Sequence, residues 1–224
     1  MQRKVFADYF NNKTKINVGS NKHVYFDISG LDENKELRSL IVMNLVDMMF
    51  QFIDNNKDRK KRIVIDEAWD SLQNKKIGLS KYIMNMFRYI RKLSGGVWVI
   101  SQSALDFNTK EMKASIQTNI STLIVMQQTK KQILEDTCEV FGFNEEEKEL
   151  LNSIELNIQK GYSEAFISQG NFSTILRINE SPFNYWMFTT DADDNALFRE
   201  EVKKYGNLND SNAVVRAIKS LANP

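Results

Sequence analysis

Short apolar, strand-like runs alternate with helical segments in this chain, and this alternation constrains its fold more than any other feature. Residues 63–65 are all β-branched and apolar, as in strands covered on both faces. A strand, helix, strand order is typical of parallel βαβ units with helices on the faces of the sheet. The expected strands are residues 24–29, 63–65, 96–103 and 122–128, and the expected helices are residues 37–52, 80–93, 111–120 and 129–143.

Residues 162–168 and 172–178 also have strand-like patterns, and a turn sequence containing Gly170 separates them, which predicts a β-hairpin. The expected fold is therefore α/β, three-layered, with a mostly parallel sheet, helices on both faces and an antiparallel hairpin edge. We expect residues 1–190 to form the core. Residues 191–224 are expected to form two short polar helices that pack on the core or extend from it.

Local signals refine this prediction. For the first helix, a buried face is expected at positions 37, 40, 41, 45, 48, 49 and 52. Gly95 occupies the position of a helix C-terminal signal. Asn144, followed three residues later by Glu147, predicts a capping box at the start of a helix. Cys138 is expected to be a small core residue, and His23 a surface residue.

Composition excludes several classes of protein. Thirty Lys and Arg residues against 29 Asp and Glu give a net charge of +1, which makes no general case for nucleic acid or an anionic membrane. A single cysteine suits a reducing cytoplasm and excludes an internal disulfide framework. The most apolar run, residues 40–53, is interrupted by Asn44, Asp47 and Gln51, so it is too polar to span a bilayer.

Two adjacent carboxylates follow the strand at residues 63–65, within the sequence RIVIDEAWDS. Ligands of open α/β sheets bind outside the carboxyl ends of the strands. Asp66 there suits Mg²⁺, and Glu67 could polarise a water molecule for attack on a terminal phosphate. The alternative is a charged strand end that stabilises the start of the next helix, and the motif alone leaves both interpretations open.

Two further polar signals follow. Gln102 lies in the sequence SQS after the next strand, and its amide suits the recognition of a γ-phosphate; alternatively it is a polar strand end. Arg88 and Arg91, in RYIRK, are three residues apart on one predicted helix face. They suit a phosphoryl group bound by a neighbouring subunit, or else they are solvated charges at a helix C-terminus.

Taken together, IDEAWD, RYIRKLSGG and VWVISQS resemble the conjugative-transfer ATPases of the TraC type, which belong to type IV secretion systems. The resemblance covers roughly residues 24–195, and it implies a RecA-like P-loop NTPase core that uses ATP and Mg²⁺. It implies that Asp66 holds Mg²⁺ after a Walker B strand, that Glu67 activates water and that Gln102 senses phosphate. Arg88 or Arg91 would reach a neighbour's site.

The same resemblance implies partners and a location. The partners are copies of this chain, as a hexamer in the full-length protein, and inner-membrane components of a secretion or conjugation channel. The location is the cytoplasm, or the cytoplasmic face of the inner membrane. DNA is a further candidate that the net charge does not support.

A Walker A sequence, G-x-x-x-x-G-K-[ST], does not occur in the chain. The resemblance is thus to the C-terminal part of such an ATPase, and we expect this chain alone to be inactive. Without the Walker A segment, strand edges and an apolar cleft would be uncovered, and we expect either self-association of the chain or coverage of that gap by residues 1–10. Two alternatives stay open: a catalytically inactive assembly module, and a DNA-translocase or helicase-like hexameric motor domain.

Overall fold

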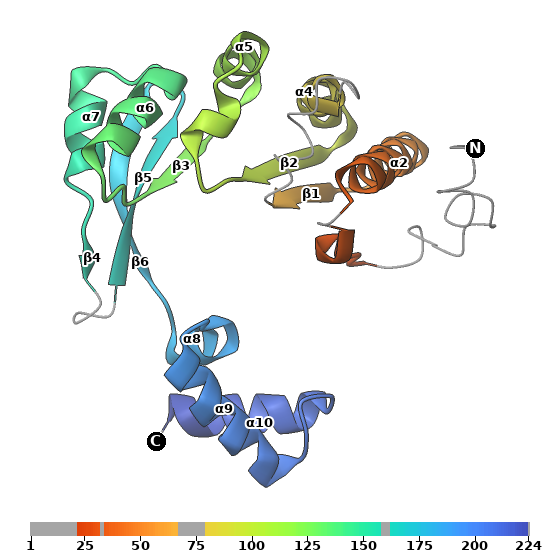
Figure 1. Ribbon diagram of the computed structural model, residues 1–224, viewed down its shortest axis with the longest axis vertical. Coiled ribbons are helices and arrows are strands. Elements are labelled where there is room, and N and C mark those ends of the chain that lie inside the picture. Colours follow the sequence, from red (N-terminus) through yellow and green to blue (C-terminus); the bar gives the residue numbers. More distant parts are fainter. Residues whose placement is uncertain (1–21, 32–33, 67–78, 158–161, 224) are drawn as a thin grey trace. The chain divides into compact units, whose positions relative to one another are not determined.

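The computed structural model describes residues 22–31, 34–66, 79–157 and 162–223. The chain forms two compact units. Unit 1 contains residues 1–121 and 130–143, and unit 2 contains residues 122–129 and 144–224. Figure 1 shows the elements of both units, which are described separately below. The segment at residues 1–10, expected to cover a gap, lies outside the described residues.

Two parallel strands form the sheet of unit 1, as the sequence predicts. β1 (Lys61–Asp66) pairs with β2 (Gly95–Ile100), from Lys61 opposite Gly95 to Asp66 opposite Ile100. Ile63 and Ile65 of β1, with Val97 and Val99 of β2, contribute to the hydrophobic core. The opposite face exposes Val64 by 61% and Trp98 by 53%.

Helix α2 (Lys35–Asn55) packs beside α4 (Leu79–Ile90) on one side of this strand pair (Figure 1). α2 begins after Asn34, whose side chain accepts a hydrogen bond from the Leu37 backbone N–H. Its buried apolar residues are Leu37, Val42, Val46 and Ile53, so the predicted position Leu37 is confirmed, whereas the predicted position Leu40 is exposed. The prediction for Leu40 is wrong because α2 is apolar on several sides, so periodicity alone fits more than one face.

The strand expected at residues 24–29 does not form. Residues 23–28 have no regular structure, and a 3₁₀ turn, η2 (Ser29–Leu31), follows them. Tyr25 is 87% exposed, while Ile28 packs against the core of unit 1. Because a strand requires a neighbour for its backbone hydrogen bonds, an alternating pattern without a paired neighbour leaves an extended segment only.

The connection from α4 to β2 differs in detail from the prediction. α4 ends at Ile90, and a 3₁₀ turn, η3 (Arg91–Leu93), continues to Ser94. Ser94, rather than Gly95, adopts the left-handed conformation, with φ of 56°. Gly95 is instead the first residue of β2, where a side chain would collide with Ile90. The glycine therefore serves close packing and does not terminate the helix.

The other elements of unit 1 in the described ranges are the 3₁₀ turn η4 (Ala104–Phe107), α5 (Lys110–Asn119) and α6 (Lys131–Phe141). Both α-helices occur where the sequence predicts them. Phe107, Met112 and Ile116 join the core of unit 1, and Cys138 is buried as expected. Gly142 ends α6 with φ of 73°, a conformation that favours glycine.

In unit 2, an antiparallel sheet is built around the predicted hairpin. β5 (Tyr162–Gln169) pairs with β6 (Phe172–Asn179) along its whole length, and β3 (Leu123–Met126) and β4 (Leu156–Asn157) share its other edge. Gly170, with φ of 61°, is the first of the two loop residues between β5 and β6. β3, expected to extend the parallel sheet, belongs to this antiparallel sheet. The predicted α/β class, which combines parallel strands and an antiparallel hairpin, is confirmed.

Unit 2 also contains four helices among its described residues. α7 (Glu145–Asn152) begins with the predicted capping box, in which Asn144 and Glu147 exchange side-chain-to-backbone hydrogen bonds. α8 (Pro182–Phe188) precedes the two predicted C-terminal helices, α9 (Ala192–Tyr205) and α10 (Ser211–Ala222). α10 contacts both α8 and α9, and Val202, Ala213 and Ala217 form their small core.

Candidate nucleotide-facing site

Asp66 is the last residue of β1, at the carboxyl end of the parallel pair, and its side chain is exposed. Its partner in β2 is Ile100, so Gln102 follows only two residues beyond the neighbouring strand end. The two strands are adjacent and parallel, as the sequence predicts, which puts Asp66 and the segment containing Gln102 at the same edge of the sheet. This is the edge where open α/β sheets bind ligands.

The turn that carries Gln102 is fixed by hydrogen bonds from the two serines beside it. Ser101 Oγ donates to the carboxylate of Asp106, and the Ser103 backbone N–H donates to Ser101 Oγ at 3.2 Å. Ser103 Oγ accepts from the Leu105 backbone N–H and so caps the turn η4. These contacts hold the backbone on both sides of Gln102, whose side chain is exposed.

Sequence reasoning missed this role of the serines. The signal was nevertheless available, because serine oxygens favour such turns and N-terminal caps, and Ser103 stands immediately before Ala104, where η4 begins. The role of Asp106, whose carboxylate accepts a hydrogen bond from Ser101, was not predicted either. All three residues support the backbone of the site.

Arg88 and Arg91 lie elsewhere. Arg88 is exposed in the last turn of α4, and Arg91 is exposed in η3, only four residues before β2 begins. Both arginines are therefore near the amino end of β2, whereas Asp66 is at the carboxyl end of β1. Six residues of strand span about 20 Å, so the structure does not bring the arginines and Asp66 of one chain together.

The described residues supply one suitable ligand for Mg²⁺, the carboxylate of Asp66, but not a complete set of ligands. An exposed carboxylate at a strand end is a suitable ligand, because Mg²⁺ is commonly held by one or two carboxylates together with phosphate oxygens and water. In the described ranges there is no cluster of three or more His, Cys, Asp or Glu residues that could hold a metal by themselves. Glu67, the predicted base, lies outside the described residues, so its role stays a prediction.

The parallel pair of β1 and β2 with its helices is an α/β arrangement, and comparisons with known proteins identify the family. Residues 3–222 match the family described as the TraG P-loop domain. The chain belongs to this family.

Two relatives are informative. Over 208 residues the chain is 21% identical to Protein TraC of Escherichia coli (strain K12), a match that covers 89% of this chain and 23% of TraC. The solved structure of VirB4 of Thermoanaerobacter pseudethanolicus has a similar fold, with a TM-score of 0.57 and 21% identity, over 70% of this chain and 41% of that one. The chain thus spans about a quarter of TraC, and its resemblance to type IV secretion and conjugation ATPases is confirmed.

Among the helices of the described segments, none combines the length and the apolar character that crossing a bilayer requires.

Proposed function

We propose that this chain is the Walker B-bearing part of a type IV secretion or conjugation ATPase, which energises pilus assembly or substrate transfer by hydrolysing ATP. Membership of the TraG P-loop domain family supports nucleotide use. The observation that carries the proposal is the parallel pairing of Asp66 with Ile100, because it places an exposed carboxylate beside the strand end leading to Gln102.

In the proposed mechanism, Asp66 would hold Mg²⁺, which would supply positive charge to offset the phosphate charge of ATP. Glu67 accepts a proton from the attacking water molecule, and Gln102 donates a hydrogen bond from its amide to the γ-phosphate. The turn fixed by Ser101 and Ser103 preorganises Gln102 for this contact.

Arg88 or Arg91 acts on the nucleotide of a neighbouring copy in a hexamer. Their position near the amino end of β2, away from Asp66, supports action between copies rather than within one chain. Inner-membrane components of a secretion channel are the proposed further partners, and the proposed location is the cytoplasmic face of that membrane.

No Walker A sequence occurs in these 224 residues, so the phosphate cradle has to come from another polypeptide segment. The same observation favours a second candidate function, an assembly module without catalysis. The motor and the assembly module are distinguished by the rate of ATP turnover. This rate is measured for the chain joined in frame to the Walker A-bearing segment of a TraG P-loop family protein.

For the motor, we expect turnover by the joined protein and none by this chain alone. Glu67→Gln in the joined protein should lower turnover about 100-fold or more and retain bound ATP, because a general base contributes at least that much. A joined protein that binds ATP without hydrolysing it would favour the assembly module. Unchanged turnover in Glu67→Gln would refute the role of Glu67.

A further inference from the structure

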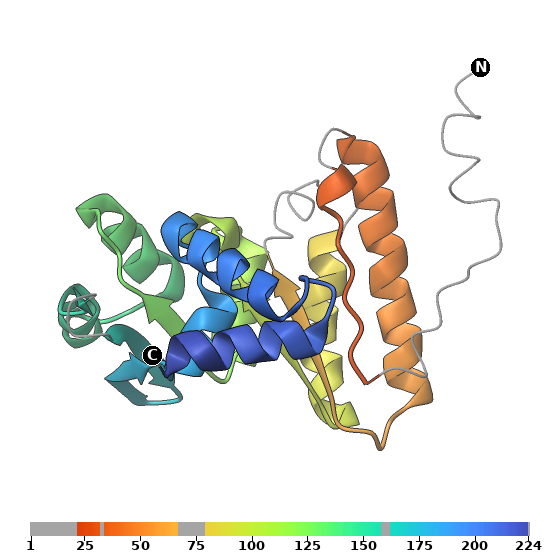
Figure 2. The same cartoon turned by 90° about the horizontal axis from the view of Figure 1, so that it is seen from below.

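A basic surface lies at the amino ends of β1 and β2, at the opposite edge of the sheet from Asp66. It is formed by the loop from α2 to β1 and by the last turn of α4 with η3, which meet at the bottom of Figure 2. Two hydrogen bonds from Lys61 link these segments. Its Nζ donates to the Leu93 carbonyl oxygen at 2.6 Å, and its backbone N–H donates to the Ser94 carbonyl oxygen at 3.3 Å.

Positive charge is concentrated on these two segments. Residues 54–62 contain five Lys or Arg residues and two Asp residues, and residues 85–93 contain three Lys or Arg residues and no acid. Lys57, Arg59 and Lys60 are exposed. Within the ranges that the structure describes, no ion pair joins any of these cations to an acid. A net charge of only +1 therefore conceals a strongly basic region, balanced by acids elsewhere.

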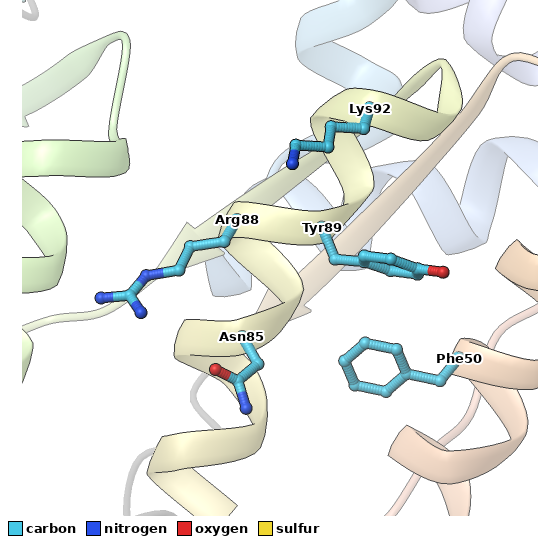
Figure 3. A pocket seen from close by; sticks show the side chains of 5 residues that line it. All are labelled: Phe50, Asn85, Arg88, Tyr89 and Lys92. Carbon is cyan, nitrogen blue, oxygen red and sulfur yellow. The ribbon is translucent and has the colours of Figure 1, made fainter.

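Beside these cations, an open groove of about 420 Å³ runs between α2 and α4. Figure 3 shows Tyr89 directed towards Phe50, with Arg88 and Lys92 pointing to the other side of the helix from the Tyr89 ring. The ring centroids of Phe50 and Tyr89 are 6.5 Å apart. Asn85 completes the lining with an exposed amide.

Tyr89 is held in this position. Its hydroxyl donates to Asp54 Oδ1 at 2.7 Å, a hydrogen bond that raises the pKa of Tyr89 above its usual value. The phenol is thus neutral at physiological pH, and its ring, 39% exposed, is available as a stacking surface in the groove.

We propose that this basic surface, comprising Lys57, Arg59, Lys60 and the groove residues Tyr89 and Lys92, binds single-stranded nucleic acid. Sites for single-stranded nucleic acid combine two features: cations that contact the phosphates, and aromatic rings on which the bases stack. A duplex hides the faces of its bases from Tyr89, and an anionic bilayer would use the charges but not a ring lying in a groove. The paired aromatic rings therefore favour a single strand.

The test measures the affinity of the 224-residue chain for a fluorescein-labelled oligothymidylate by fluorescence anisotropy at several salt concentrations. Replacing Lys57, Arg59 and Lys60 together by Gln should weaken binding about tenfold or more. It should also reduce the salt slope by about 2, because each phosphate contact on a single strand contributes about 0.7. The matched control, Lys110, Lys130 and Lys131 together to Gln, removes the same charge from other exposed positions and should leave the affinity within about twofold.

A second pair of variants tests stacking. Tyr89→Leu should weaken binding about fivefold or more, whereas Tyr89→Phe, which keeps the ring and loses the hydroxyl, should bind nearly as well. Far-UV circular dichroism verifies that each variant is folded. Arg88 and Arg91 are left unchanged, so the result is independent of the role proposed for them in ATP hydrolysis.

Three results would overturn the proposal: equal losses in the two triple variants, no loss in Tyr89→Leu, or no binding of the oligonucleotide by the unsubstituted chain. Sedimentation with vesicles containing phosphatidylglycerol serves as the counter-test. If the Lys57, Arg59 and Lys60 variant loses vesicle binding while oligonucleotide binding is unaffected, the surface is a membrane contact and the assignment to nucleic acid is wrong.

Discussion

Gly95 lies so close to Ile90 that a Cβ atom at position 95 would come within 2.4 Å of Ile90 Cγ1. Ile90 is 2% exposed and belongs to the core of unit 1. Lys61 Cγ, on the neighbouring strand, would be 3.0 Å away. A hydrogen atom at this position thus allows the end of α4 to pack against the start of the parallel strand pair.

Gly95→Ala should therefore destabilise unit 1 by about 1–3 kcal/mol, the usual range for overpacking a core. The control is Gly96→Ala, because a Cβ at position 96 would meet no atom within 4 Å, so its effect should stay within about 0.5 kcal/mol. Urea unfolding followed by circular dichroism measures both. Equal stability of the two variants would show that Ile90 can move aside.

The capping box of α7 offers a test in unit 2. Asn144 Oδ1 accepts a hydrogen bond from the Glu147 backbone N–H at 2.9 Å, and Glu147 Oε2 accepts one from the Asn144 backbone N–H at 3.0 Å. Asn144→Ala should cost about 1 kcal/mol, because it leaves a helix N-terminal N–H group without its partner. Asn144→Asp, which keeps the acceptor, should cost little; an equal loss in both would exclude the cap as the cause.

Glu201 makes the stability of α9 dependent on pH. Its carboxylate accepts a hydrogen bond from Lys204 Nζ at 2.5 Å, and contacts with Lys204 first and Ser220 second lower the pKa of Glu201. A lowered pKa in the folded state means that the stabilisation is complete above the unfolded-state pKa, near 4.5, and disappears as the pH falls through the lower folded-state pKa. Glu201→Gln should thus be less stable than the unsubstituted chain at pH 7.

This difference should decrease below about pH 4.5. Thermal unfolding of both proteins between about pH 3 and about pH 7, in steps of about one pH unit, measures this difference in stability. Glu200→Gln, an exposed neighbour on the same helix, is the control and should show a smaller difference. A Glu201→Gln difference that stays constant across this range would contradict the proposed ion pair.

Elements with strong local signals could be predicted from the sequence. The hairpin formed because Gly170 supplies positive φ between two alternating runs, and α7 formed where Asn144 and Glu147 close a capping box. The order of apolar runs likewise gave the parallel neighbours β1 and β2, and hence the proximity of Asp66 to the segment with Gln102. These features depend on residues close in sequence or on simple strand order.

Features that depend on distant contacts could not be predicted in this way. The run at 24–29 has a strand pattern, yet pairing requires a neighbour that local sequence does not specify. The buried face of α2 depends on what packs against it, and position 95 requires glycine because Ile90 is near, a contact that periodicity does not reveal. Within the site, the serine hydrogen bonds around Gln102 were not predicted, because the strand was expected to continue to residue 103, whereas β2 ends at Ile100.

Asp66 is proposed to face a Mg²⁺-bound nucleotide, and the most direct test measures ATP affinity with and without Mg²⁺ in the protein joined to a Walker A segment. Asp66→Asn should weaken Mg²⁺–ATP binding about tenfold or more and leave metal-free binding, measured in EDTA, unchanged. Arg62→Gln, on the same face of β1 at its other end, should change neither value. If Asp66→Asn binds Mg²⁺–ATP as tightly as the unsubstituted protein, Asp66 does not hold the metal and the account is contradicted.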